Sequence, residues 1–468
     1  MDSFAGPFSA LSVDMGSSSI KVLRADVGPD GSVRLTEPRS IEHQPVQRGP
    51  YLEWDVEQLV LDVVAQESGR APAGRLAVSI DGWGNGLVFL DRHGRRVGPV
   101  RCYRDPGLAR ADELVRRRGW PELVGERTGC RVGIDSTLVQ LVAVLDERPA
   151  WLSDVVRVVP LVDHLGDLLS GAGADAAVGL SPASSSGFVD PRTGRIDREL
   201  LEQLEIPSGW VPDPQPELRT AGRILDARLA DGVQGLVVKV AGHDTATALV
   251  AGPARTAGRC FVGLGSWAVA GAVVGPELRG AAPFRLRAPV VHEATAEGDL
   301  RVNHDIPGMR LVQQLEREQL GRPATAAERT ALFPEPGGWE QAPVVDVLGL
   351  DVHASLVEQV QVWGRAAGRP VGTFEQQLRE VLRGIAAAVA DTVGQLAAAG
   401  LTSPGPGIWM CGGGVRVQAL PVWIAELTGW SVELGPVEAS ALGGALGAVG
   451  VVRADDVESV GSPGGEDG

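Results

Sequence analysis

Two short segments of this chain share one pattern, and they lie about half a chain apart. Residues 13–17 read Val-Asp-Met-Gly-Ser and residues 262–266 read Val-Gly-Leu-Gly-Ser, and apolar residues continue after each Gly-Ser pair. This pattern is typical of a strand, a tight turn and a second strand. Because Ser17 and Ser266 are 249 residues apart in a chain of 468, the echo predicts two similar domains that face one another across a cleft. The alternative is coincidence, since the chain has 62 glycines.

Strands and helices alternate along the chain, which indicates the α/β class. We expect buried strands over residues 9–14, 20–26, 75–81, 86–90, 236–241, 260–264 and 268–274, and a strand that runs into a glycine loop over residues 406–414. We expect helices over residues 55–68, 107–118, 136–147, 161–169, 373–400 and 437–450. Residues 181–221 show little periodicity. The expected domains span residues 1–242 and 243–453, and an acidic tail over residues 454–468 is expected to be disordered.

Composition narrows the classes of function. The net charge is −16, and nucleic acid as a main partner would require a basic face. The sequence contains no run of 18 or more apolar residues, so we do not expect a membrane-embedded protein. The four cysteines are scattered without a CxxC pair, which favours a reduced, cytoplasmic compartment over a disulfide framework or a zinc site. The sequence leaves open whether the protein forms a homodimer.

The first Gly-Ser turn carries a set of groups that suits phosphate. Asp14 ends the buried strand, Ser17, Ser18 and Ser19 follow at the turn, and Lys21 is one of only two lysines. Backbone N–H groups, hydroxyls and an ammonium can hold phosphate oxygens, and Asp14 could hold Mg²⁺ largely through water. The alternative is a serine-rich hairpin turn. The Gly-Lys-Ser/Thr of a Walker A loop is absent.

The second Gly-Ser turn also matches a dinucleotide-binding pattern. Residues 263–268 fit G-x-G-x-x-A after a strand. That fingerprint requires a helix next, whereas the short apolar run over residues 268–274 favours a strand. We therefore expect a second hairpin here.

Asp244 is the candidate general base. It lies in the segment Gly242-His243-Asp244-Thr245. This segment follows a buried strand, and small residues there indicate the start of a helix. A carboxylate there can accept the proton of a hydroxyl nucleophile, and His243 could bond a neighbouring sugar hydroxyl. The alternatives are that Asp244 only caps the helix and that His243 is a satisfied polar group in the core.

Three further clusters suit a sugar or a nucleotide. Trp83 and Gly84, and likewise Tyr103 and Arg104, set aromatic faces beside polar or flexible neighbours. Core packing is the more frequent role of a tryptophan. The glycines at 412–414 follow a strand and could let an adenine lie against the backbone, or they could form a flexible turn.

The order of these motifs resembles the FGGY carbohydrate kinases, within the actin-like, ribonuclease-H-like ATPase superfamily, and most of all their rhamnulokinase branch. The resemblance is carried by VDMGSSSIK (13–21), SIDGWGNGLVFLDRHGRRVG (79–98), YRD (103–105), GHDTA (242–246), GLGSWAV (263–269), IPGMRLVQQL (306–315), CGGG (411–414) and GPVEASALGGALGA (435–448).

The resemblance implies two actin-like domains with a nucleotide and sugar cleft between them. It implies transfer of the γ-phosphoryl group of ATP to a sugar hydroxyl, with Mg²⁺ and with Asp244 as general base. The first domain would bind sugar and supply the first phosphate loop, and the second would bind nucleotide. The implied sugar contacts are Trp83, Gly84, Tyr103, Arg104, His243, Asp244, Thr245 and Asp305. The implied nucleotide contacts are Ser17, Ser18, Ser19, Lys21, Gly265, Ser266, Gln313, Gly413 and Gly414, with Asp14 at the metal.

The sugar itself stays open at this point. Asp305 stands where the rhamnulokinase pattern has an asparagine, and a few hydrogen bonds can set the preference of such a site. Fuculose, xylulose or ribulose are alternatives to rhamnulose. A non-catalytic sugar- or nucleotide-binding regulator and an actin-like filament or chaperone ATPase are alternatives of other classes. Retention of Asp14, Lys21, Asp244 and Ser266 argues against the regulator, and the sugar-type clusters argue against the filament.

Overall fold

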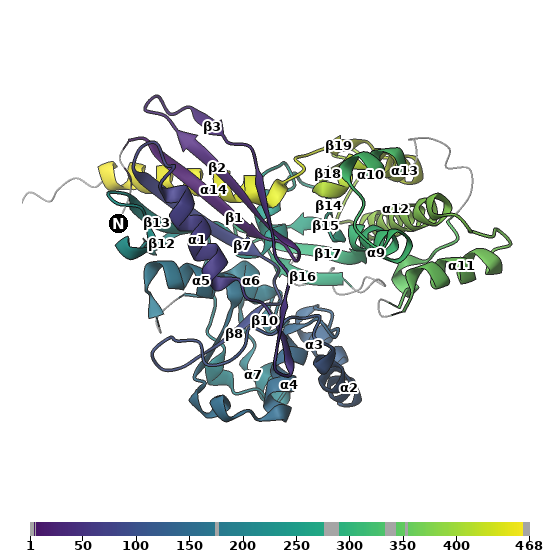
Figure 1. Cartoon of the computed structure of the whole chain (residues 1–468), viewed down its shortest axis with the longest axis horizontal. Coiled ribbons are helices and arrows are strands. Elements are labelled where there is room, and N and C mark those ends of the chain that lie inside the picture. Colours follow the sequence, from purple (N-terminus) through teal and green to yellow (C-terminus); the bar gives the residue numbers. More distant parts are fainter. Residues whose placement is uncertain are drawn as a thin grey trace, which may run out of the picture. The chain divides into compact units, whose positions relative to one another are not determined.

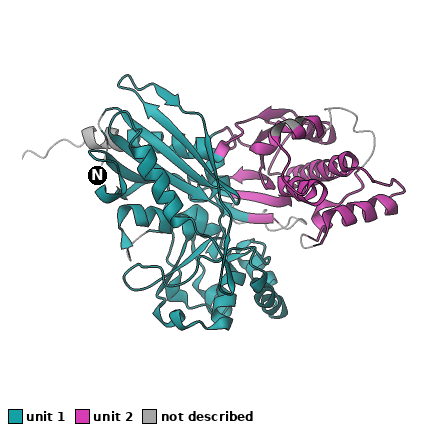
Figure 2. Cartoon of the chain, in the orientation of Figure 1, with its two compact units in different colours: residues 1–251, 292–300, 440–468 teal, residues 252–291, 301–439 magenta. Residues whose placement is uncertain are grey.

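The computed structural model describes residue 4 and residues 6–173, 177–275, 290–332, 343–351 and 354–461 (Figure 1). These residues form two compact units, shown in teal and magenta in Figure 2. The first unit comprises residues 1–251, 292–300 and 440–468, and the second comprises residues 252–291 and 301–439.

The first unit is built on a seven-stranded sheet. Its strands are β1 (Phe8–Met15), β2 (Ser19–Val27), β3 (Val33–Leu35), β4 (Arg39–Glu42), β7 (Arg75–Gly82), β12 (Arg219–Arg223) and β13 (Gln234–Lys239). The order is β12-β13-β7-β1-β2-β3, and β4 also pairs with β2. β1 forms an antiparallel hairpin with β2, and it pairs in parallel with β7, which pairs in parallel with β13. Almost every residue of β1 is buried, because both faces of this sheet are covered.

The second unit repeats this topology. A six-stranded sheet, most of which belongs to this unit, has the order β16-β17-β15-β14-β18-β19. Its strands are β14 (Cys260–Leu264), β15 (Trp267–Val274), β16 (Val290–Ala294), β17 (Leu300–Pro307), β18 (Ile408–Cys411) and β19 (Val432–Leu434). β14 and β15 form an antiparallel hairpin, and β14, β18 and β19 run parallel. The echo between residues 13–17 and 262–266 therefore marks the same hairpin in two related sheets. β15 is a strand, so residues 263–268 lack the helix that the dinucleotide-binding fingerprint requires.

The remaining elements surround these sheets. In the first unit they are β5 (Val46–Arg48), β6 (Tyr51–Glu53), α1 (Glu57–Ser68), β8 (Leu87–Leu90), α2 (Ala109–Arg117), α3 (Trp120–Thr128), α4 (Thr137–Glu147), β9 (Arg157–Pro160), α5 (Leu161–Ser170), α6 (Leu180–Ser184), β10 (Val189–Asp190), β11 (Arg195–Ile196), α7 (Arg198–Gln203) and α8 (Asp244–Val250). In the second unit they are α9 (Met309–Leu320), α10 (Ala326–Leu332), α11 (Leu356–Ala366), α12 (Phe374–Ala398) and α13 (Ala419–Thr428). α14 (Ala439–Gly461) ends the described chain.

α14 returns to the first unit. Its residues Ala441, Ala445 and Ala448 are fully buried in a core that contains apolar residues of β1, β2, β7 and β13. Glycines let the helix come close: a β-carbon on Gly443 would lie 1.9 Å from the Thr247 carbonyl oxygen, and one on Gly447 would lie 2.4 Å from Val240. The GPVEASALGGALGA segment thus serves close packing of a helix on the first sheet.

This path of the chain differs from the expected division in two places. The first stretch of the first unit ends at residue 251 rather than 242, and residues 440–453 belong to the first unit rather than to a second domain. α14 continues to Gly461, past residue 454, where the expected tail begins. Residues 462–468 lie outside the described residues.

α12 is the central helix of the second unit. It packs against α13, β15, α9 and α11, and its buried residues include Leu378, Val381, Leu382 and Ile385. Within the described part of the chain, this is the one helix whose length and composition would let it cross a membrane, and 56% of its most apolar stretch is buried in the protein. Such burial is what the core helix of a globular domain shows.

Candidate active site

The expected site residues gather in two groups, one in each unit. The first unit holds Asp14, Ser17, Ser18, Ser19, Lys21, Trp83, Gly84, Tyr103, Arg104, His243, Asp244 and Thr245. The second unit holds Gly265, Ser266, Asp305, Gln313, Gly413 and Gly414.

Three carboxylates meet at the carboxyl ends of the central strands of the first sheet. Asp14 and Asp81 are register partners on the parallel strands β1 and β7. Burial raises the pKa of Asp81 well above its usual range, and the charges of Asp14 and Asp244 raise it further. Asp81 is fully buried, whereas Asp14 is half-buried and the Asp244 side chain is 33% exposed. Asp14 and Asp244 are therefore the carboxylates that a ligand can reach.

Asp244 is the first residue of α8, which follows β13 after a connection of residues 240–243. The N–H of Thr245 donates to Asp244 Oδ1 at 2.6 Å and to His243 Nδ1 at 3.2 Å. Because Nδ1 accepts, a neutral His243 carries its hydrogen on Nε2, which faces Glu293 Oε1 at 3.7 Å. His243 rather than Asp244 is the N-cap of α8. The Thr245 N–H thus holds the Asp244 carboxylate at the first residue of α8, and the Asp244 side chain remains partly exposed.

The DGWG segment lies against this base segment. The N–H of Gly82 donates to the Gly242 carbonyl oxygen at 3.0 Å, and a β-carbon on Gly84 would lie 2.6 Å from His243 Cδ2. The Ser185 hydroxyl donates to the Gly84 carbonyl oxygen at 3.1 Å. The structure thus brings together Gly84 and His243, two of the residues that the resemblance implies as sugar contacts.

Aromatic side chains line the same region of the first unit. Trp83 lies 6.5 Å from Tyr103 and 4.6 Å from Trp54, measured between ring centroids. The Arg104 guanidinium lies 5.2 Å from the Trp54 ring and donates to the Ser17 carbonyl oxygen at 2.9 Å. Burial raises the pKa of Tyr103, against the opposing effect of Arg104. Trp83, Tyr103 and Arg104 therefore stand together beside the first Gly-Ser turn.

Trp54 and His43 belong to this cluster, and sequence reasoning missed both. The His43 ring lies 5.5 Å from Trp54 and 6.2 Å from Trp83. Burial lowers the pKa of His43, although its bond to the Gly16 carbonyl raises it. Nε2 donates to that carbonyl at 2.8 Å. No sequence signal singles out Trp54, which is one of 11 tryptophans.

The turn itself is compact. The N–H of Gly16 donates to the Ser19 carbonyl oxygen at 3.0 Å, and Ser18 is exposed. Lys21 is the cross-strand partner of Asp14, so both side chains lie on one face of the hairpin. Lys21 Nζ donates to Ser40 Oγ at 3.0 Å on the exposed side. A hydroxyl, an ammonium and a carboxylate are thus presented at one hairpin tip.

The corresponding tip in the second unit is covered by the start of α9. The N–H of Met309 donates to the Gly265 carbonyl oxygen at 3.0 Å, and the N–H of Arg310 donates to the Ser266 carbonyl oxygen at 3.2 Å. The Arg310 guanidinium lies 3.9 Å from the centroid of the Trp267 ring. Gln313 is on the next turn of α9 and is half-buried. Gly265, Ser266 and Gln313 therefore belong to one local assembly.

The glycine loop after β18 packs on this tip. Gly412 has φ +91°, which favours glycine, and a β-carbon there would lie 2.8 Å from the Leu264 carbonyl oxygen. A β-carbon on Gly414 would lie 2.7 Å from Leu264 Cβ, and Gly413 is exposed. The loop thus brings bare backbone beside Gly265.

Asp305 lies on β17 in the second unit. Asn303 Nδ2 donates to Asp305 Oδ1 at 2.9 Å, and Arg301 Nη1 donates to Asn303 Oδ1 at 2.8 Å. Alternate residues of a strand share a face, so these three side chains form a polar ladder. Arg301 is fully buried and Asp305 is half-buried.

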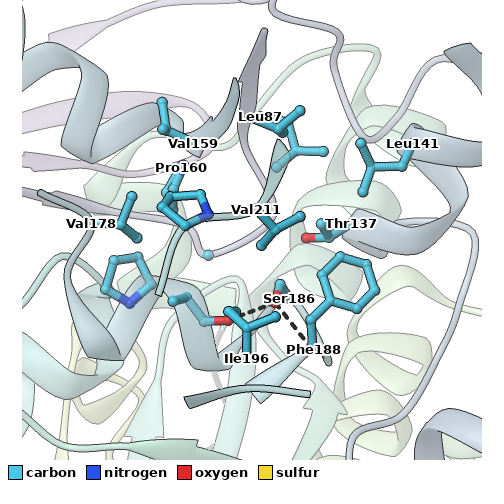
Figure 3. Close-up of a pocket in the computed structure, with 15 residues that line it drawn as sticks. Leu87, Thr137, Leu141, Val159, Pro160, Val178, Ser186, Phe188, Ile196 and Val211 are labelled. Carbon is cyan, nitrogen blue, oxygen red and sulfur yellow. Dashed lines mark hydrogen bonds between the residues drawn. The ribbon is translucent and has the colours of Figure 1, made fainter. Parts of the chain in front are cut away.

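A small cavity in the first unit borders Gly84 but has a different character (Figure 3). It measures about 30 Å³ and is lined mainly by apolar side chains, among them Leu87, Leu141, Val159 and Phe188. Apolar walls offer a sugar no hydrogen-bond partners. The apolar lining therefore sets this cavity apart from the polar site.

The residues present fit a hard divalent cation only with help from a ligand. In the part of the chain that the structure describes, no group of three or more His, Cys, Asp or Glu side chains is arranged to hold a metal ion. Mg²⁺ is usually held by one or two carboxylates together with waters and substrate phosphates. Asp14, half-buried and in a cluster of negative charge that raises the pKa of Asp81, suits such a site.

Part of the chain matches a known protein family. A family model described as "FGGY family of carbohydrate kinases, N-terminal domain" matches residues 9–251, more than half of the chain.

Curated relatives match along most of the chain. A rhamnulokinase of Mannheimia succiniciproducens is 28% identical over 449 residues, which covers 92% of this chain and 87% of that protein. A rhamnulokinase of Yersinia pestis is 28% identical over 461 residues, with 92% and 88% covered.

Solved structures share the fold. Xylulose kinase from Rhodospirillum rubrum has a TM-score of 0.70 at 17% identity and covers 98% of this chain and 91% of its own. Plasmodium falciparum glycerol kinase with ADP has a TM-score of 0.72 at 12% identity, with 98% and 93% covered. The expected α/β, actin-like fold of two domains is confirmed by these likenesses.

Proposed function

Because the chain belongs to the FGGY family of carbohydrate kinases, and is therefore a sugar kinase that uses ATP, we propose that its acceptor is a ketose of the rhamnulose type and that Asp244 is the general base. One observation carries this proposal. The partly exposed Asp244 carboxylate stands at the start of α8, next to the Gly84–His243 contact and in the same unit as the Trp83–Tyr103–Arg104 cluster.

The residues divide the reaction between them. Asp244 accepts the proton of the attacking sugar hydroxyl, which makes that oxygen a stronger nucleophile toward the γ-phosphorus. The sugar is oriented by Gly84, His243 and Thr245. It is surrounded by the side chains of Trp83, Tyr103 and Arg104. The hydroxyls and N–H groups of Ser17, Ser18 and Ser19, together with Lys21, offset phosphate charge. Asp14 would hold Mg²⁺, which supplies further charge neutralisation when bound.

The second unit supplies the nucleotide contacts in this proposal. Gly265 and Ser266 would bind phosphate, and Gln313, Gly413 and Gly414 would bind the rest of the nucleotide. We also propose that the enzyme works in the cytoplasm, in keeping with its four buried cysteines, which are scattered along the chain without a CxxC pair.

We propose rhamnulose as the sugar because the two curated relatives described above are rhamnulokinases. Fuculose, xylulose and ribulose are the competing acceptors. Asp305 is the residue that separates these options, because a carboxylate only accepts hydrogen bonds where an asparagine can also donate.

A coupled assay of ADP release tests the proposal. The purified chain is given ATP, Mg²⁺ and one sugar at a time from a panel of ketoses, polyols and aldoses, with a sugar-free control. We expect release that depends on a ketose, with rhamnulose the best acceptor. Release that is equal without sugar would exclude this function, and a better acceptor in the panel would replace rhamnulose.

Asp244→Asn is the matched variant in that assay. The amide keeps the acceptor for the Thr245 N–H but cannot take a proton. We expect turnover to fall by about 10²–10⁴-fold with an unchanged melting temperature. Turnover close to that of the wild type would show that another group is the base.

A further inference from the structure

Residues 181–185 and Glu217 form a hydrogen-bonded brace behind the base segment. Ser181, on α6, accepts at Oγ from the N–H of Gly242 at 3.0 Å and from the N–H of His243 at 3.2 Å. Glu217 Oε1 accepts from the same Gly242 N–H at 2.7 Å, and its Oε2 accepts from the Ser181 N–H at 2.8 Å. One carboxylate therefore ties α6 to the backbone that leads into Asp244.

The same short segment touches two other parts of the site. Ser185 donates to the Gly84 carbonyl oxygen, and Ser184 Oγ accepts from the N–H of Ala294 at 2.9 Å. Ala294 follows Glu293, the residue that faces His243. The serines at 181, 184 and 185 thus fasten the three backbone segments that surround His243.

Glu217 is an unusual group to bury for this purpose. It is 7% exposed, and among the described residues no arginine or lysine forms an ion pair with it. Burial raises the pKa of Glu217 to about 7, although the bonds from Ser181 and Gly242 lower it. A buried carboxylate without a cation is costly. Its two oxygens are what satisfy two backbone N–H groups from separate segments.

We propose that Glu217 and Ser181 are positioning residues of the phosphoryl transfer, which fix the Gly242–His243 backbone so that Asp244 presents its carboxylate at a constant place. The inference rests on Asp244 being the base in the proposed function. α8 has only seven residues, so its start depends on the segment before it. The backbone of Gly242 is fixed on both sides. Its N–H donates to Glu217 and Ser181, and its carbonyl oxygen accepts from the Gly82 N–H.

The effect on catalysis follows from geometry. Glu217→Gln keeps the volume, but its amide nitrogen must face one of two N–H donors, so one bond is lost and the base segment shifts. A misplacement of about 1 Å can cost about 10²-fold in rate. We expect kcat to fall at least about tenfold, while the KM for ATP stays within about twofold.

Glu67→Gln is the matched control. Glu67 is also a buried glutamate of the first unit, but it accepts from the arginine side chains of Arg24, Arg39 and Arg70. Both variants are compared per folded molecule, with the folded fraction taken from calorimetry. We expect Glu67→Gln to keep the wild-type kcat. A Glu217→Gln variant with wild-type kcat per folded molecule overturns the proposal.

Two further measurements separate a positioning role from a structural one. If Glu217 acts through Asp244, adding Glu217→Gln to Asp244→Asn should lower kcat by much less than it does in the wild type. An equal further loss in both backgrounds overturns the proposal. If Glu217→Gln fails to fold, Ser181→Ala takes its place, with an expected loss of kcat of at least about threefold from one missing acceptor.

Hydrogen exchange distinguishes failure of this inference from failure of the proposed function. The amides of Gly242 and His243 should exchange faster in Glu217→Gln than in the wild type, while those of the β1–β2 hairpin should not. This result is independent of turnover. Unchanged exchange overturns the brace itself, whereas faster exchange in a chain without sugar-dependent turnover keeps the brace and rejects the proposed function together with the catalytic role of Glu217.

Discussion

Gly84 packs against His243 so closely that no side chain fits between them. A β-carbon on Gly84 would lie 2.6 Å from His243 Cδ2 and 2.2 Å from Ser185 Oγ. Gly84 comes from the segment after β7, and His243 from the segment after β13, two strands that pair in parallel. The two segments thus meet at the same edge of the sheet, and the missing side chain of Gly84 is what lets them touch.

Gly84→Ala should therefore impair sugar use more than stability. The new methyl group forces His243 or Ser185 to move, and we expect kcat/KM for the sugar to fall by about 10²-fold. Gly209→Ala is the control, because a β-carbon there has no neighbour within 4 Å. Steady-state kinetics with varied sugar checks this. Equal kinetics in the two variants would contradict the close contact.

The packing of α14 predicts opposite effects of two glycine substitutions on one helix. A β-carbon on Gly443 would lie 1.9 Å from the Thr247 carbonyl oxygen, whereas one on Gly450 has no neighbour within 4 Å. Gly443→Ala should lower the free energy of unfolding by about 1–3 kcal/mol through overpacking. Gly450→Ala should raise it by about 0.5–1 kcal/mol, because alanine favours helix. Urea unfolding measures both, and a shared sign would show that α14 does not pack as described.

Local patterns were enough to predict the parts of the fold that depend on neighbours in sequence. Gly-Ser turns between apolar runs predicted both hairpins, and apolar spacings of three and four predicted α12. The Asp14, Trp83 and His243 segments could be placed at strand ends for the same reason. The structure then showed which of these ends meet.

The parts that sequence reasoning missed depend on contacts between distant residues. Ser181 and Glu217 lie in a stretch without periodicity, and their roles appear only through bonds to Gly242. Trp54 and His43 reach Trp83 through packing alone. α14 was expected in the second domain, because a helix of small residues carries little sign of the sheet it will cover.

Asp167 predicts a pH dependence of stability. Burial raises the pKa of Asp167 to about 7, although Lys239 lowers it. The folded state therefore binds more protons than the unfolded state between about pH 4 and pH 7, so this group lowers the free energy of unfolding as pH rises through that window, by about 4 kcal/mol at most.

Asp167→Asn should remove that dependence. On going from pH 5 to pH 7.5, the wild type should lose at least about 1 kcal/mol more of its free energy of unfolding than the variant does. Guanidinium unfolding at the two values measures it. Asp62→Asn, on the exposed side of α1, should leave the difference as in the wild type, and the same result for Asp167→Asn would show that its carboxyl is not perturbed by burial.

Asp305→Asn tests which residue sets the choice of sugar. The variant restores the asparagine of the rhamnulokinase pattern, and its Oδ1 can still accept from Asn303 Nδ2, so the ladder to Arg301 is kept. An amide can donate as well as accept, and a site that hydrogen-bonds a sugar hydroxyl discriminates strongly against acceptors that leave it unpaired. We expect kcat/KM for rhamnulose to rise relative to xylulose and ribulose by about tenfold. Asp391→Asn, on the exposed face of α12, is the control and should leave the ranking unchanged. A ranking that Asp305→Asn also leaves unchanged would show that Asp305 does not contact the acceptor, and the search for the specificity residue would move to the aromatic cluster around Trp83.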